Sequence, residues 1–142
     1  MAVQEFFVTP QSDQDSEHAL RPGEIVTEIH VPPPGNARMA IYDVLQREAL
    51  DWPLAAAAVV LNLEGGSAKS ARVVLGHVAP VPWPSPEAEA ALAGKTINED
   101  VAWQAGKAAL SKATPLSKNA YKVQLARVAI KRAVLRAVNG QA

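Results

Sequence analysis

An apolar segment that ends in a pair of glycines constrains the fold of this chain more than any other feature. Residues 54–63 are apolar almost throughout, and Glu64-Gly65-Gly66 follows them directly. Periodicity alone does not assign such a segment: its four alanines favour a helix, whereas its β-branched residues and the glycine turn favour a strand. Because residues 71–79 form a second β-branched segment after a short turn, we interpret the two segments as a β-hairpin.

Two further strands are predicted before the hairpin. Side chains alternate between two faces from Glu24 to Val31, and proline-rich turns bound this segment on both sides, since proline supplies no donor to a sheet. A second strand is expected from Arg38 to about Leu45. Residues 1–22 are mostly polar and have too little apolar surface to fold alone, so we interpret them as a connecting arm.

Three helices are predicted after the hairpin. Ser85 caps the first, with Pro86 at its first helical position, and Gly94 ends it. Asn98 caps the second, and the third runs over residues 117–138. Strands followed by helices indicate an α+β fold, in which an antiparallel sheet of three to four strands packs on a layer of three helices. With 142 residues, we expect a single domain over residues 1–142.

Several kinds of site are excluded by the residues that the chain lacks. There is no cysteine, so thiolate zinc sites and iron–sulfur clusters cannot be held by this chain. Glycine-rich phosphate loops and the nucleophile elbow of hydrolases are missing. The three histidines are scattered, at His18, His30 and His77, and show no metal-ligand spacing. We therefore expect no metal site and no catalytic residues.

Charge is unevenly placed although the net charge is zero. Residues up to Glu64 include ten acidic and three basic side chains, and the remainder four acidic and eleven basic. Without interleaved aromatic residues, the basic C-terminal part indicates a solvated helix face or an acidic partner, and not a nucleic acid. No apolar run approaches the roughly 20 residues of a membrane span, and no secretory signal is visible. We expect a cytoplasmic protein with no membrane partner.

Residues 46–53 form a loop between two apolar strands that combines several functional side chains. Trp52 could cover a flat cofactor ring, or it could be an ordinary aromatic residue that caps the core. Arg47 and Asp51 could bond a polar ring edge, or they could form a local ion pair. Tyr42 could point to the same place, although a cross-strand aromatic pair would explain it as well.

Several segments resemble one flavoprotein family, in order and over nearly the whole chain. Leu20-Arg21-Pro22-Gly23-Glu24 resembles the strand that opens the C-terminal domain of the FAD-carrying subunit of molybdenum hydroxylases, the xanthine dehydrogenase and CO dehydrogenase group. The pattern Tyr42, Arg47, Asp51-Trp52-Pro53-Leu54-Ala55 is similar to the loop and strand of that domain. Gly76-His77-Val78-Ala79-Pro80-Val81-Pro82 resembles its Gly-x-Val-Ala-Pro-x-Pro signature, and Tyr121-Lys122 its last helix.

The resemblance implies a role beside a cofactor that another domain binds. Enzymes of this group pass electrons from molybdenum through iron–sulfur clusters to FAD. It implies that Tyr42, Arg47, Asp51 and Trp52 approach the flavin, that the partners are an FAD-binding domain, an iron–sulfur subunit and a molybdenum subunit, and that the chain is not catalytic alone. The FAD-binding domain itself is expected to be absent from this chain. A freestanding protein-interaction module without a flavin role is the alternative.

The sequence also departs from the family pattern at two places. Pro84-Ser85 follows Trp83 where relatives commonly have an arginine, and the segment through Glu17 differs from the shorter common version. These departures concern the start of the first helix and the position of the arm.

Overall fold

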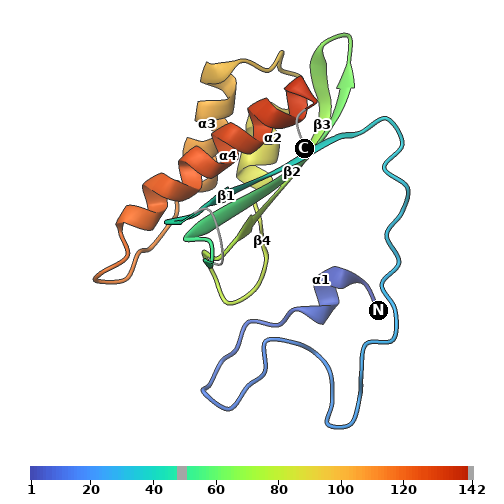
Figure 1. Ribbon diagram of the computed structural model, residues 1–142, viewed down its shortest axis with the longest axis vertical. Coiled ribbons are helices and arrows are strands. Elements are labelled where there is room, and N and C mark those ends of the chain that lie inside the picture. Colours follow the sequence, from blue (N-terminus) through green and yellow to red (C-terminus); the bar gives the residue numbers. More distant parts are fainter. Residues whose placement is uncertain (48–50, 141–142) are drawn as a thin grey trace.

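The centre of the structure is a four-stranded antiparallel sheet with the strand order β1-β2-β3-β4. The computed structural model describes residues 1–47 and 51–140. The strands are β1 (Arg38–Val44), β2 (Ala55–Glu64), β3 (Ser67–Gly76) and β4 (Trp83–Pro84). β1 and β4 are the two edges, so each strand lies beside its neighbour in the sequence (Figure 1).

The predicted hairpin is confirmed as β2 and β3. Gly65 and Gly66 connect them with φ angles of 58° and 83°, which glycine adopts without the steric cost that a Cβ would add. Burial alternates along β2, where Ala55, Ala57 and Val59 are buried and the residues between them are less so. A helix would show no such period of two, so tertiary pairing decides the assignment that the alanines left open.

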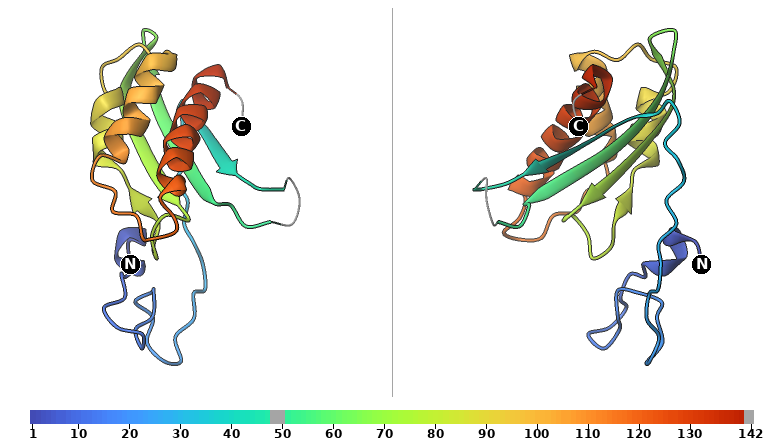
Figure 2. Two further views of the ribbon diagram at one scale, coloured as in Figure 1. Left: turned by 90° about the vertical axis from the view of Figure 1, so that its left-hand side faces the viewer. Right: turned by 45° about the vertical axis from the view of Figure 1, so that its right-hand side comes forward.

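Helices α2 (Pro86–Leu92), α3 (Glu99–Ala109) and α4 (Tyr121–Asn139) follow the sheet. The predicted caps are confirmed: Ser85 Oγ accepts from the Ala88 N–H, and Asn98 Oδ1 accepts from the Val101 N–H at 2.9 Å. Each cap satisfies a backbone donor that has no partner inside the helix. Figures 1 and 2 show all three helices on the same side of the sheet. The predicted α+β fold with an antiparallel sheet and a three-helix layer is therefore confirmed.

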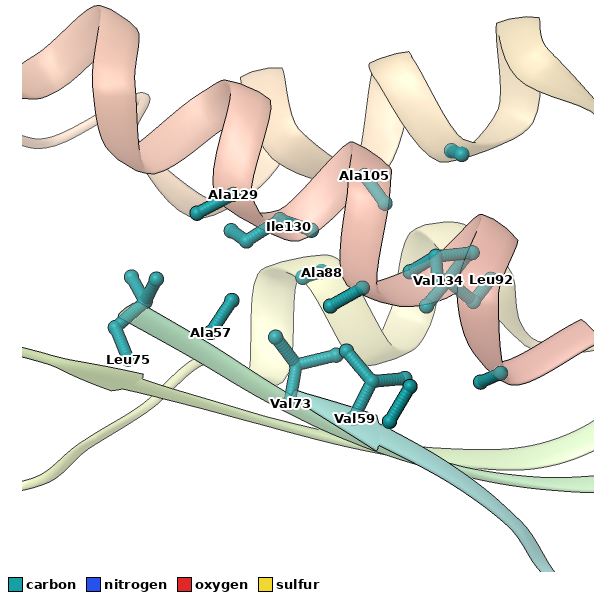
Figure 3. Packing of buried hydrophobic residues seen from close by; sticks show 14 of the residues in the cluster. Ala57, Val59, Val73, Leu75, Ala88, Leu92, Ala105, Ala129, Ile130 and Val134 are labelled. Atoms are coloured by element: carbon teal, nitrogen blue, oxygen red, sulfur yellow. The ribbon is translucent and has the colours of Figure 1, made fainter. Parts of the chain in front are cut away.

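The core lies between the sheet and this helical layer (Figure 3). Ile130 and Val134 of α4 pack over the sheet, towards Val59 and Val73. Alanines are frequent among the fully buried residues, which lets the helices approach one another and the sheet closely. The fully buried residues include Ala55, Ala57, Leu61, Ala68, Leu75, Ala88, Leu92, Ala102, Ala105, Ala126, Ala129, Ala133 and Ala137.

Residues 24–31 differ from their prediction. The structure places them in an extended segment that belongs to no strand, and the side chains of Ile25, Ile29 and Val31 are 79%, 76% and 82% exposed. The backbone of residues 25–33 forms no backbone hydrogen bond with any residue that the structure describes. Alternating side chains form a strand only where the edge of another strand lies alongside to share backbone hydrogen bonds. Among the described residues, no strand edge lies beside this segment.

Other differences are smaller. A four-residue helix, α1 (Val3–Phe6), lies near the N-terminus, and a single bridge joins Phe7 to His18 within the arm. β4 supplies the fourth strand of the sheet, and α4 begins four residues later than the predicted start at Ser117. The arm extends away from the helices and the sheet (Figures 1 and 2).

Candidate functional site

The four predicted site residues lie in or beside the connection between β1 and β2. The register pairs Val44 with Ala55 at the base of this connection, where the Leu54 N–H also donates to the Val44 carbonyl at 2.8 Å. Gly76, the last residue of β3, pairs with Ala56 at the same end of the sheet. The segment that follows Gly76 therefore emerges beside the candidate loop. Residues 48–50 of the predicted loop lie outside the described residues.

Trp52 is the most exposed tryptophan, with 81% of its surface accessible. Its indole ring meets the imidazole of His77 at an angle of 60°, with 6.2 Å between the ring centroids. His77 follows Gly76 with a φ of 60°, a left-handed conformation that is uncommon for a residue with a side chain. Its carbonyl accepts from Lys122 Nζ at 2.7 Å, which ties the turn to the first residues of α4. The alternative that Trp52 caps the core does not fit an indole so exposed.

Tyr42 occupies a different environment from Trp52. It is half-buried on the helix-covered side of β1, opposite Ala57 in the register. The guanidinium carbons of Arg132 and Arg136 lie 5.0 Å and 4.6 Å from the centroid of its ring, and Arg132 Nη1 donates to its hydroxyl. Two cations against one aromatic ring stabilise it by their attraction to the π electrons. Arg136 Nη1 also donates to the Ile41 carbonyl at 3.1 Å, so these contacts fasten α4 to the edge strand.

Arg47 is exposed and Asp51 is half-buried. Within residues 1–47 and 51–140, no ion pair or hydrogen bond joins their side chains, so the alternative of a local ion pair is not observed. Tyr42 and Trp52 have different neighbours: the ring of Tyr42 lies against Arg132 and Arg136, and that of Trp52 lies against His77. The structure thus places the four residues in one region of the sheet without assembling them into one contact network.

Three residues of this region were not singled out from the sequence. In the sequence, Arg132 and Arg136 belong to the basic C-terminal part, and His77 is one of three scattered histidines. The spacing of four residues that puts both arginines on one side of a helix was a usable signal. Which aromatic residue they would meet depends on how α4 lies on β1, and the sequence does not specify that.

A separate hollow of about 500 Å³ opens between β4 and the connection from α3 to α4. Its walls are mostly apolar and include Leu75, Trp83, Pro115 and Val123. Asn119 also lines it, and the Oδ1 atom of this side chain is buried without a hydrogen-bond partner among the described residues. None of the four predicted site residues lines this hollow, so it is distinct from the candidate loop.

Charged side chains of the helical layer form local ion pairs. Lys131 Nζ donates to Glu99 Oε2 at 2.7 Å, which lowers the pKa of the Glu99 carboxyl. The pKa of Glu87 is also lowered, chiefly by a hydrogen bond from its own backbone N–H and then by Lys112.

Among the described residues, no three acidic or histidine side chains gather into a possible metal site. No helix in this part of the chain is long and apolar enough to cross a membrane.

Comparison with known proteins places this geometry in a family. Residues 40–137 match the family described as CO dehydrogenase flavoprotein C-terminal domain. The carbon monoxide dehydrogenase medium chain of Afipia carboxidovorans is 34% identical over 123 residues, which cover 84% of this chain and 43% of the relative. The aldehyde oxidoreductase FAD-binding subunit PaoB of Escherichia coli is 28% identical over 128 residues, covering 89% and 37%.

Solved structures agree with the sequence matches. A chain of the cyanide-inactivated Cu,Mo-CO dehydrogenase superposes with a TM-score of 0.76 at 34% identity, over 87% of this chain and 44% of that one. Quinoline 2-oxidoreductase from Pseudomonas putida gives 0.69 at 28% identity, over 74% and 38%. The chain spans less than half the length of these relatives. It belongs to the CO dehydrogenase flavoprotein C-terminal domain family, the C-terminal domains of the FAD subunits of molybdenum hydroxylases.

Proposed function

We propose that this chain packs beside an FAD held by a flavin-binding domain, in an oxidoreductase whose electrons pass from molybdenum and iron–sulfur centres to that FAD. The observation that supports this role best is the exposed indole of Trp52, which is in the loop where family resemblance implies a flavin contact. When a flat ring packs against an exposed indole, the apolar surface of both rings is removed from water, and this burial is favourable.

The residues present are compatible with a flavin neighbour. Trp52 offers an aromatic surface, Asp51 an acceptor, and Arg47 a set of donors at the edge of the same loop. FAD supplies the redox chemistry when it is bound, because these side chains cannot. Their proposed part is to orient the ring and to keep water away from it.

Tyr42 has a different proposed role. Both guanidinium groups beside it are used to hold α4 against β1, so Tyr42 would position the loop that leads from Val44 to Trp52. No carboxylate among the described residues pairs with Arg132 or Arg136, which leaves both charges available to an acidic partner. In the proposed complex such carboxylates would come from the iron–sulfur or the molybdenum subunit.

Purification of the tagged chain from its own host tests this proposal. The expected result is yellow material with a flavin absorbance spectrum, in which mass spectrometry identifies molybdenum and iron–sulfur subunits. If the purified complex contains no flavin, the proposal is wrong and a freestanding interaction module is favoured.

The variant Trp52→Ala then tests the contact with the ring. Indoles quench flavin fluorescence when they stack on it, so we expect brighter flavin emission and altered reoxidation of the reduced flavin. Trp83→Ala is the matched control, because it removes an indole from the opposite edge of the sheet. Equal emission from the two variants and the parent would contradict a contact between Trp52 and the flavin.

A further inference from the structure

One face of the sheet is covered by no helix of the described residues. Helices α2, α3 and α4 all lie on the other face, as both views in Figure 2 show. Because paired residues of antiparallel strands point to the same side, the register defines the residues of this bare face. One row across it is Ile41, Ala58 and Val74, and the row beside it is Met39, Val60 and Arg72.

The bare face is apolar where a solvated face would be polar. An antiparallel sheet with one side in water normally alternates apolar and polar residues along each strand. In β2 the outward positions Ala56, Ala58 and Val60 are instead apolar, and the polar outward residues, Asn62 and Glu64, lie only near the hairpin turn. The half of β2 away from that turn therefore has the composition of a strand that is covered on both sides. In β1 the outward side chains of Met39 and Ile41 are 50% and 58% exposed. Contiguous apolar surfaces of this kind usually mark an interface.

Towards the candidate loop, the row of this face consists of Asp43, Ala56 and Gly76, so it has one exposed charged residue at the edge and two small residues beside it. Ala56 pairs with Gly76, and a Cβ added at Gly76 would lie 3.4 Å from the Cβ of Ala56, an ordinary contact distance. Space therefore does not require the glycine, and its φ is not left-handed. What the missing side chain provides is room for another surface to approach the backbone of β3 closely.

Residues 24–37, which connect the arm to β1, also present an apolar surface. This segment leaves β1 on the side away from the helices (Figure 1), and the backbone of residues 25–33 forms no backbone hydrogen bond with any described residue. Residues 1–37 make up more than a quarter of the chain, so the match over 84% of it to the medium chain must include part of this region. An extended segment of this kind adds to the edge of another sheet through backbone hydrogen bonds.

We infer that the bare face of the sheet, together with the extended segment 24–31, is the docking surface for the polypeptide that carries the flavin. This inference rests on the proposed function and specifies its interface. Matched relatives are about twice as long as this chain or longer, and one is named as an FAD-binding subunit, so they contain a further polypeptide region of suitable size. The helical side and the pair Arg132 and Arg136 are left for other subunits.

Site-specific photocrosslinking in the host complex tests the inference. A photoreactive amino acid is placed at Ile41 on the bare face or at Gln104, which is exposed on α3. We expect the peptide linked to position 41 to belong to the flavin-carrying region, on the same polypeptide or another, with at least about tenfold less of that adduct from position 104.

Several outcomes would overturn the inference. These are an adduct from position 41 to a second copy of this chain, to the iron–sulfur subunit or to the molybdenum subunit, and no adduct from that position at all. An adduct to the flavin-carrying region from position 104 alone would overturn it too. In each case the flavin content of the same complex is measured, so a wrong docking face is distinguished from a wrong function.

The variant Ala58→Arg gives a second test that does not require crosslinking. Ala58 is exposed, so the variant should fold, which circular dichroism checks. An arginine in the middle of an apolar interface has no partner there, and the flavin recovered with the chain should fall at least about tenfold. Gln104→Arg is the matched control and should leave recovery unchanged. Equal recovery with both variants would exclude the bare face as the interface.

Discussion

Gly106 provides a sharp test of how the helical layer is packed. Gly106 is a buried residue in the interior of α3, and a Cβ added to it would lie 2.6 Å from the carbonyl oxygen of Arg127 in α4. Ordinary van der Waals contact begins at 3.4 Å, so α3 and α4 must separate by nearly an ångström to accept an alanine. The obstacle is backbone and cannot rotate away. Ala102 and Ala105, which are fully buried on the same helix, would lose contacts as the helices part.

Two opposing effects set the expected change in the free energy of unfolding for Gly106→Ala. Alanine is favoured over glycine in a helix by about 0.5–1 kcal/mol. Overpacking a close contact costs about 1–3 kcal/mol. We expect a net loss of about 1–2 kcal/mol, or a melting temperature lower by roughly 3–6 °C, measured by thermal and urea unfolding.

A matched pair of variants measures the helix preference separately. Gln104 is exposed on the same helix, so the difference between Gln104→Ala and Gln104→Gly reports the preference for alanine without any packing change. If Gly106→Ala is stabilised by that same difference, the close approach of α3 and α4 does not exist and the reasoning is refuted.

Three further predictions concern the core and its ion pairs. Ile130→Ala should lower the free energy of unfolding by about 2–5 kcal/mol, because Ile130 is fully buried between helix and sheet, and an unchanged urea midpoint would contradict its place in the core. In a double-mutant cycle, Tyr42→Leu and Arg136→Met should show a coupling energy of about 0.5–1 kcal/mol, whereas strictly additive effects would exclude the cation–π contact. The pKa of Glu99 is lowered by Lys131, so the stability from this pair is present above the ordinary glutamate pKa and is lost as the pH falls through the lowered value. Glu99→Gln should therefore reduce the loss of stability on acidification, and parallel pH profiles of variant and parent would contradict the assignment.

Much of the fold could be predicted because its signals are local. The two glycines of the hairpin, the Ser85 and Asn98 caps and the order of strands before helices each depend on a few adjacent residues, and all were confirmed. The strand expected over residues 24–31 was wrong for a related reason. Alternation describes which side chains could share a face, but a strand also needs a neighbouring edge, and the described residues provide none.

The candidate site could be predicted only in part. Trp52 was proposed from its loop and from family resemblance, and its exposure fits that proposal. The two arginines beside Tyr42 were missed because they are ninety or more residues away in the sequence. Contacts at such separations depend on how a helix is rotated on a sheet, which no local pattern encodes.

The sequence by itself determined the hairpin, the capped helices and the membership suggested by the motifs around Tyr42, Trp52 and Gly76. Only the tertiary structure decided that the three helices gather on one face and leave the other apolar face of the sheet open. The physical reason is that a strand such as β2, apolar at nearly every position, specifies burial on both sides but not what covers each side. The helices cover one side, and the arrangement in space leaves the other side without a helix among the described residues.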